Sequence, residues 1–223
     1  MKQVLNSWRK LGTATISDAL DRMGIPGQCL GIKPLTPDAR IAAYAFTVRM
    51  SPVRDAKGTV GDYVDEVGQG MVVVIDNGGR MDATVWGDLL TEVATRRGLA
   101  GTVIHGVCRD SSHSIEIRYP IFSLGTHMRT GKGRVQFEAS NVVVKLGEVP
   151  VTPGDLIVGD ADGVVVVPVN REAEVLSAAL QIQKAEEAIR AAIHRGERLD
   201  IARRQFGYHK LQEKPRTAAH DPY

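Results

Sequence analysis

The centre of the sequence places an amphipathic helix between two apolar runs, and this spacing constrains the fold more than any other feature. Residues 71–75 are entirely apolar, residues 88–97 have helical apolar spacing closed by Gly98, and residues 102–104 form a second run with β propensity. A strand, a helix and a strand within about 35 residues form a βαβ unit, whose strands are parallel and whose crossover is right-handed. The sequence therefore predicts an α/β fold with a parallel centre.

The segments around this unit extend the same pattern. Residues 13–23 have helical apolar spacing, with Thr13 or Thr15 able to cap the start and Gly24 able to end the helix. We also expect a strand at 41–48, a break in the central strand at 76–79, a short helix at 111–117 and a strand at 121–124.

The second half of the chain changes from long to short β runs. Residues 135–137, 142–144, 156–158 and 164–167 are short β runs separated by turns rich in Gly, Asp and Pro, which favours antiparallel or mixed pairing in an added β layer. The pattern from 171 to 195 predicts a long C-terminal helix. We expect a single domain from residue 1 to 206, followed by a polar tail from 207 to 223.

The charge balance and the cysteine usage exclude several function classes. Lys and Arg number 28 against 26 Asp and Glu, and this formal charge of +2 favours neither nucleic acid nor an anionic membrane as a partner. No stretch has the length and apolarity of a leader or a membrane span. Cys29 and Cys108 lack the spacing of a disulfide framework or a zinc site. We therefore expect a cytoplasmic protein without nucleic-acid or membrane partners.

Two polar segments follow the predicted parallel strands, at the edge of the sheet where ligands usually bind. The helix that begins at Asp88 offers unpaired backbone N–H groups, which favour a carboxylate or phosphate, and Gly87 allows that ligand to approach the backbone. Arg109 can hold the same anion, while Asp88 and Asp110 supply hard oxygen ligands for Mg²⁺ or a similar cation. Such a site suits the stabilisation of an enolate.

Each of these features also has a purely structural interpretation. Gly87 and Asp88 are common at helix caps, and Asp110 can cap the helix that follows it. His105, at a strand end, either lines the pocket or packs in the core. The segment 160–163 resembles part of a calcium loop but is better explained as a tight turn. Residue spacing alone leaves these alternatives open.

The same segments resemble the family that contains 4-hydroxy-4-methyl-2-oxoglutarate aldolase and the RraA-type regulators of ribonuclease E. The matching segments are residues 15–21, 86–90, 106–110, 154–155 and 162–168. The paired Gly-Asp and Arg-Asp segments are the specific part. The chain departs from the family at His105, where aldolase members often have Asp, and at residues 67–70, where Pro-Gly-Asp is usual.

This resemblance implies a β/β/α swivelling-type fold and a homotrimer or hexamer with sites at the subunit interfaces. It also implies a class II pyruvate aldolase that requires Mg²⁺ or Mn²⁺. The expected reaction is retro-aldol cleavage of 4-hydroxy-2-oxo acids to pyruvate, with oxaloacetate decarboxylation, since both reactions pass through pyruvate enolate. The alternatives are an RraA-like regulator that binds a ribonuclease without catalysis and a related enzyme acting on another oxo or hydroxy acid.

The resemblance also implies a role for each site residue. Asp110 would coordinate the metal, Asp88 would bind a metal-bound water, and Arg109 would contact the 2-oxo acid. The backbone amides of Leu89 and Leu90 would hold the carboxylate of that acid.

A further acidic residue is implied on the C-terminal helix of a neighbouring subunit. A glutamate there would approach the metal, and Glu186 and Glu187 are the candidates.

Overall fold

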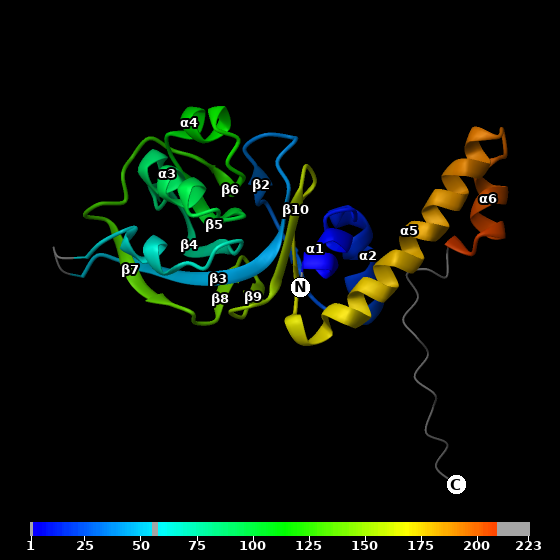
Figure 1. The fold of residues 1–223 in the computed structure, drawn as a ribbon, viewed down its shortest axis with the longest axis horizontal. Coiled ribbons are helices and arrows are strands. Elements are labelled where there is room, and N and C mark those ends of the chain that lie inside the picture. Colours follow the sequence, from blue (N-terminus) through cyan, green and yellow to red (C-terminus); the bar gives the residue numbers. More distant parts are fainter. Residues whose placement is uncertain (1, 55–57, 209–223) are drawn as a thin grey trace, which may run out of the picture.

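The computed structural model describes residues 2–54 and 58–208 (Figure 1). The α-helices are α1 (Lys2–Trp8), α2 (Thr13–Met23), α3 (Asp88–Arg96), α4 (Ser111–Glu116), α5 (Glu172–His194) and α6 (Leu199–Gln205), and the 3-10 helices are η1 (Asp62–Glu66) and η2 (Val169–Arg171). The strands are β1 (Gln28–Cys29), β2 (Lys33–Pro34), β3 (Ile41–Pro52), β4 (Val72–Thr84), β5 (Gly101–Cys108), β6 (Ile121–Thr126), β7 (Val135–Ser140), β8 (Val144–Leu146), β9 (Val149–Val151), β10 (Leu156–Asp160) and β11 (Gly163–Val167). Within the described ranges, no helix has the length and apolarity needed to cross a membrane.

A continuous mixed sheet forms the centre of the molecule. Its strand order is β1-β11-β10-β3-β4-β5-β6-β2, and β7 pairs with β3 outside this path. Strands β3, β4, β5 and β6 are parallel, whereas β10 pairs antiparallel with both β3 and β11. The long strand β3 therefore joins the parallel strands to an antiparallel region.

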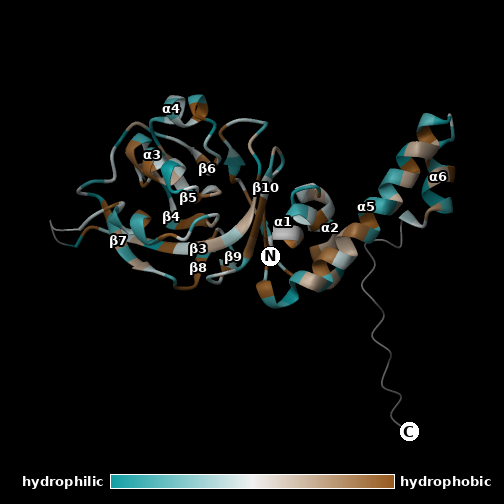
Figure 2. Cartoon of the chain, viewed as in Figure 1, coloured by the Kyte–Doolittle hydropathy of each residue, from teal (hydrophilic) through white to brown (hydrophobic). Residues whose placement is uncertain are grey.

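Three apolar clusters separate the layers of the fold. The first packs one face of the parallel strands against α3, through side chains such as Ile75 and Ala94. The second fills the space between the other face of those strands, the antiparallel strands and the β8–β9 hairpin. The third packs α1, α2 and α5 against the outer face of β10 and β11. Strand β10 is thus buried on both faces, and much of it is hydrophobic in Figure 2.

The central predictions from the sequence are confirmed. Strands β4 and β5 are parallel and α3 connects them. The helix predicted for residues 13–23 is α2, and Gly24 ends it in the left-handed conformation with φ 65°. The chain also has the predicted antiparallel strands and the long C-terminal helix, α5.

The predicted break at residues 76–79 is wrong. Strand β4 continues through this segment, with a shift in its register against β5 between Asp76 and Arg80. Gly78 and Gly79 have φ values of 63° and 70°, which glycine adopts without steric cost. The two glycines therefore form an irregularity within the strand, because β5 continues to supply partners beyond it.

The predicted cap of α2 is also wrong. Gly12 is the N-cap residue, and neither Thr13 nor Thr15 makes a capping hydrogen bond. Instead, the Thr13 N–H donates to Oδ2 of Asp160 at 2.8 Å, and the Thr13 hydroxyl donates to Oδ1 at 2.6 Å. Residues 160–163 form the tight turn between β10 and β11, as expected, and Asp160 fixes the start of α2.

Several short elements are not predicted from the sequence: the helices α1, α6, η1 and η2 and the strands β1, β2 and β9. Helix α6 packs on the end of α5 through Ala192, Ala202 and Phe206, and this end of α5 stands away from the sheet in Figure 1. The domain boundary between residues 206 and 207 stays a prediction. Most of the predicted tail, residues 209–223, lies outside the described residues.

Candidate active site

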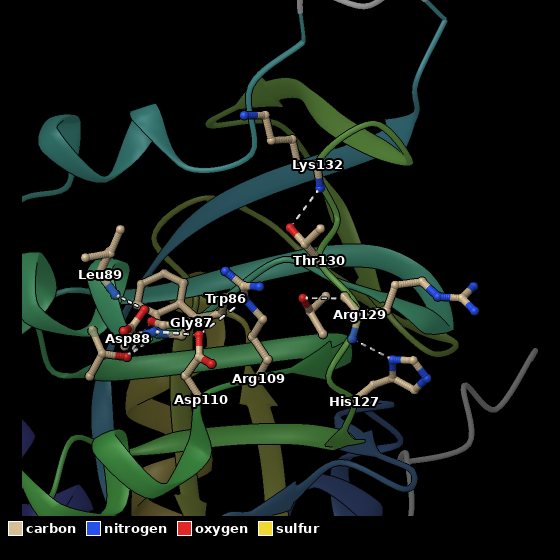
Figure 3. A network of polar contacts seen from close by, with 12 residues as sticks. Trp86, Gly87, Asp88, Leu89, Arg109, Asp110, His127, Arg129, Thr130 and Lys132 are labelled. Carbon is tan, nitrogen blue, oxygen red and sulfur yellow. Dashed lines mark hydrogen bonds and ion pairs between the residues drawn. The ribbon is translucent and has the colours of Figure 1, made fainter.

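The end of β5 and the start of α3 bring together the two segments singled out in the sequence. The backbone N–H of Asp88, at the first turn of α3, lies 3.5 Å from Oδ2 of Asp110. The same oxygen is 3.2 Å from Nε of Arg109. Figure 3 shows these groups side by side. The prediction that the two segments meet is therefore confirmed by the geometry.

Asp110 has an unusual backbone conformation for a residue other than glycine. Its φ of 53° and ψ of 34° lie in the left-handed region, and its carboxylate makes no capping hydrogen bond to α4. Aspartate tolerates this region better than most residues, although it is sparsely populated. The capping interpretation is therefore wrong, and the conformation turns the Asp110 carboxylate toward Gly87 and Arg109.

Gly87 is required at its position by the space around it. A Cβ added there would lie 2.7 Å from Oδ2 of Asp110 and 3.3 Å from Nε of Arg109. The backbone of Gly87 is extended, so this requirement comes from the close approach of Asp110 and not from backbone strain. Gly87 thus allows the two acidic segments to approach each other.

A buried set of hydrogen bonds fixes the first turn of α3. The indole Nε1 of Trp86 donates to the Thr91 hydroxyl at 2.9 Å, and that hydroxyl lies 2.9 Å from the Gly87 carbonyl oxygen. Ser114 of α4 is 3.0 Å from the same hydroxyl. Thr91 and Ser114 are fully buried, so these bonds tie α3 and α4 together in a water-excluded setting.

Arg109 is held at two points but keeps its terminal groups available. Its backbone N–H donates to the Trp86 carbonyl at 2.9 Å, and its Nε faces Asp110. Among the described residues, none accepts a hydrogen bond from its terminal NH₂ groups, and the side chain is 40% exposed. Arg109 also lines the adjoining cavity, so its guanidinium can bind an anion there.

The backbone amides of Leu89 and Leu90 lie in the first turn of α3, where the helix itself supplies no acceptor. The Leu89 N–H is engaged by Oδ1 of Asp88 at 2.8 Å. An incoming carboxylate would therefore have to displace the Asp88 side chain from this amide. Such a displacement would free the Asp88 carboxylate to face a cation or its water.

A cavity of about 530 Å³ adjoins these groups. The Gly-Asp segment and Arg109 line one end of it, and two further segments complete its wall: residues 58–65 and residues 130–132. Neither segment is predicted as part of a site from the sequence, although both contain glycine. Their role depends on chain folding, since they are far from residue 88 in sequence.

The donor atoms present fit a hard divalent cation. Asp88 and Asp110 offer carboxylate oxygens, and Mg²⁺ typically takes one or two carboxylates while keeping several waters. In the part of the chain that the structure describes, no group of three or more His, Cys, Asp and Glu residues is arranged to hold a metal. Two carboxylate donors suit Mg²⁺ or Mn²⁺, which complete their coordination with water.

His105 does not line the cavity, in contrast to the interpretation that placed it there. Its Nδ1 is 3.6 Å from Oδ1 of Asp76 on the neighbouring strand. Burial acts to raise the pKa of Asp76, but His105 and the backbone N–H groups of Gly78 and Lys145 outweigh it and lower that pKa. His105 therefore lies beside Asp76 on the sheet face that carries β8.

Neither cysteine is suited to be a nucleophile. Burial raises the pKa of Cys29 to about 12. Burial likewise raises the pKa of Cys108, which is fully enclosed next to the site. Because the thiolate is the reactive form, both side chains are expected to be structural.

The glutamates considered as metal neighbours lie on the far side of the chain. Helix α5 packs on β10 and β11 with α2, whereas α3 packs on the parallel strands at the other end of the molecule (Figure 1). Glu186 is half-buried and 3.4 Å from the Thr15 hydroxyl, while Glu187 is exposed. Neither glutamate can complete the site of its own chain.

A family model described as RraA-like, Aldolase/RraA, matches residues 13–166. The chain belongs to the Aldolase/RraA family. The matched range contains both acidic segments and ends before α5 begins. Of the segments that carry the resemblance, only 86–90 and 106–110 meet at the cavity. Asp155 and Asp160 instead bind backbone N–H groups and are structural.

Two relatives span most of this chain. It is 40% identical to the Legionella pneumophila protein DlpA over 212 residues, which are 93% of this chain but 34% of DlpA. The chain thus spans about a third of the length of DlpA. It is 37% identical over 193 residues to a protein of Halalkalibacterium halodurans named putative 4-hydroxy-4-methyl-2-oxoglutarate aldolase, covering 85% of this chain and 88% of that protein.

Two solved structures share the Aldolase/RraA fold. An uncharacterized protein from Pseudomonas syringae pv. tomato is 41% identical, with a TM-score of 0.85, and the match covers 91% of this chain and 98% of that chain. Streptomyces coelicolor RraAS2, titled an unusual member of the RNase ES inhibitor RraA protein family, is 30% identical with a TM-score of 0.75, covering 83% and 94%. The family therefore includes proteins named for two different functions.

Proposed function

We propose that this protein is a divalent-metal-dependent lyase that cleaves 4-hydroxy-2-oxo acids to pyruvate by a retro-aldol reaction and decarboxylates oxaloacetate. The observation that carries the proposal is the position of Arg109, whose terminal NH₂ groups face a cavity beside two carboxylates and a helix N-terminus. An arginine and a cation next to the same 2-oxo acid stabilise negative charge that develops on its C2 oxygen. The named substrate of the relatives, 4-hydroxy-4-methyl-2-oxoglutarate, belongs to this class.

The residues of this chain would divide the work as follows. Asp110 would hold Mg²⁺ or Mn²⁺ directly and Asp88 would hold it through water. When bound, the cation supplies a Lewis acid for the C2 oxygen. The backbone amides of Leu89 and Leu90 would bind the substrate carboxylate, because the N-terminus of α3 favours an anion. Arg109 would donate to the C2 oxygen as its charge increases.

The proposed cleavage breaks the bond between C3 and C4 of the substrate. The C4 hydroxyl loses its proton and becomes a carbonyl, while the electron pair of the broken bond forms pyruvate enolate. A proton added at C3 then gives pyruvate. Oxaloacetate decarboxylation produces the same enolate with loss of CO₂, so one site serves both reactions.

We further propose a homotrimer or hexamer with the β/β/α swivelling-type arrangement of layers. The glutamates of α5 lie away from the site in their own chain, so only a neighbouring copy could bring one to Asp110. Glu186 and Glu187 are the residues to test.

A direct assay decides the enzymatic proposal. Metal-free protein is mixed with oxaloacetate or 4-hydroxy-4-methyl-2-oxoglutarate, and pyruvate is measured before and after Mg²⁺ or Mn²⁺ is added. We expect pyruvate release above the rate with metal alone, and EDTA should abolish it. Absence of metal-dependent turnover on every 4-hydroxy-2-oxo acid and on oxaloacetate would exclude the proposal.

The second candidate is an RraA-like regulator that binds a ribonuclease without catalysis. It is favoured by the match to RraAS2, whose title refers to a ribonuclease inhibitor family. A pull-down that recovers a ribonuclease equally well with the wild-type protein and with Asp110→Ala, from a protein without lyase activity, would support this function. Loss of pyruvate release in Asp110→Ala would support the lyase.

A further inference from the structure

The cavity is longer than the head of a 2-oxo acid requires. Gly87, Asp88 and Arg109 line one end, where the carboxylate and the C2 oxygen would bind. The cavity continues from there between η1 and the first two turns of α3, where Val60, Val64, Leu90 and Val93 line it. We call these four residues the apolar end. A substituent on C4, which is two bonds from C2, would extend into the apolar end.

The apolar end is part of the packed interior. Val64 is buried, and Val60, Leu90 and Val93 are half-buried and pack against the cluster beneath α3. The contact between η1 and α3 is close, since a Cβ on Gly61 would lie 2.6 Å from Cδ2 of Leu90. This wall is preformed and offers an uncharged surface to a ligand.

The charged groups around the apolar end do not favour a second carboxylate on the ligand. Asp62 and Asp65 also line the cavity, and among its described lining residues Lys132 is the only cation besides Arg109. Asp65 is 73% exposed, and its Oδ1 lies 3.8 Å from Nη1 of Arg97. An ion pair this exposed and this long neutralises the Asp65 charge only weakly. In Figure 3 the Lys132 side chain points away from Arg109 and Asp110. A carboxylate on C4 would therefore meet two acidic side chains, Asp62 and Asp65, and a single ammonium, that of Lys132.

We infer, on the basis of the proposed function, that the site prefers 4-hydroxy-2-oxo acids with an uncharged alkyl or aryl group on C4 over those with a carboxylate on C4. Cleavage would release pyruvate and an apolar aldehyde or ketone. Transfer of each further methylene from water to the apolar end favours binding by about fourfold. The carboxylated substrate would lose part of its hydration and gain only the exposed Lys132 as a cation in exchange.

The inference is tested with a homologous series of substrates. The kcat/KM for pyruvate release is measured with 4-hydroxy-2-oxopentanoate, 4-hydroxy-2-oxohexanoate, 4-hydroxy-2-oxoheptanoate and 4-hydroxy-4-methyl-2-oxoglutarate. We expect an increase of about fourfold per methylene along the alkyl series, with the dicarboxylate at least tenfold below the best alkyl substrate. A dicarboxylate rate equal to or above that of every alkyl substrate would overturn the inference.

A charge placed in the apolar end provides the matched variant. Val93→Lys should lower kcat/KM for the heptanoate and raise the relative rate of the dicarboxylate. Thr95→Lys is the control, because Thr95 lies on the same helix but is exposed and does not line the cavity. If both variants change the ratio of kcat/KM for the heptanoate to kcat/KM for the dicarboxylate equally, the apolar end does not select the C4 substituent.

The failure of this inference can be separated from failure of the proposed function. Pyruvate ends at C3 and cannot reach the apolar end. Metal-dependent exchange of its methyl protons with D₂O therefore tests only the end of the cavity formed by Gly87, Asp88 and Arg109. Exchange together with a preference for the dicarboxylate would overturn the substrate preference alone. Absence of both exchange and cleavage of every substrate would overturn the proposed function.

Discussion

The Asp110 carboxylate occupies the space that a side chain on Gly87 would need, since a Cβ there would be 2.7 Å from Oδ2. Gly87→Ala should therefore displace Asp110 and lower metal-dependent activity on the order of 10²-fold, the loss expected when a charge-stabilising group leaves its position. Gly12→Ala is the control, because Gly12 also precedes a helix but its Cβ would be 3.8 Å from the nearest atom. Equal activity of Gly87→Ala and Gly12→Ala would show that the close approach of Asp110 to Gly87 is not needed for metal-dependent activity.

Arg109 is predicted to need its planar guanidinium and not only a positive charge. Its Nε faces Asp110 while its terminal NH₂ groups face the cavity, and a lysine ammonium cannot do both. Arg109→Lys and Arg109→Ala should each lower kcat/KM for 2-oxo acids on the order of 10²-fold. Arg129→Lys serves as the control because Arg129 does not line the cavity. Wild-type kinetics in Arg109→Lys would refute this role.

Thr91 is predicted to stabilise the fold through its hydroxyl. Thr91→Val would leave the buried N–H of Trp86 without its acceptor, which costs about 1–3 kcal/mol of unfolding free energy. Thr95→Val is the matched control on the same helix, because its hydroxyl only bonds a carbonyl one turn back at an exposed position. Denaturant unfolding measures both variants. A loss in Thr91→Val no larger than in Thr95→Val would contradict the prediction.

Asp160 is predicted to make stability depend on pH. Burial acts to raise its pKa, but the hydrogen bonds from Thr13 and Asp162 and the charge of Arg40 outweigh burial and lower the pKa below the ordinary value. The carboxylate therefore contributes stability above the unfolded-state pKa of about 3.9, and this contribution is lost as the pH falls through the folded-state pKa.

The variant Asp160→Asn should lower the unfolding free energy by about 1–3 kcal/mol at pH 7, and its difference from the wild type should shrink below about pH 4. Asp162→Asn, in the same turn but exposed, should behave like the wild type. A difference between Asp160→Asn and the wild type that is the same at pH 7 and pH 3 would show that the Asp160 charge is not responsible.

The parts of the fold that the sequence predicts are those set by local pattern. Helix α2 matches its predicted range because its apolar spacing and Gly24 act within one helix. Helix α1 was missed, since it has seven residues and is held by a distant contact, the 2.9 Å bond from Trp8 Nε1 to Glu172. The path of β4 past Gly78 likewise depends on its partner strand, which no local signal reveals.

The same distinction applies to the candidate site. The meeting of Asp88 and Asp110 follows from the position of both at the ends of neighbouring parallel strands. The left-handed conformation of Asp110 and the wall formed by residues 58–65 depend on tertiary packing and could not be predicted. The sequence left His105 open between the pocket and the core, and the regular parallel register of β4 against β5 places Asp76 next to it.

Stabilisation of pyruvate enolate is the central claim, and proton exchange at the methyl group of pyruvate in D₂O measures it most directly. Proton NMR would follow the exchange with wild-type protein and with Asp110→Asn, which removes one charge and keeps a residue that tolerates the left-handed backbone. We predict exchange that requires protein and Mg²⁺ or Mn²⁺, and that falls in Asp110→Asn to the rate with metal alone. Exchange by the folded wild-type protein no faster than with metal alone would contradict the claim.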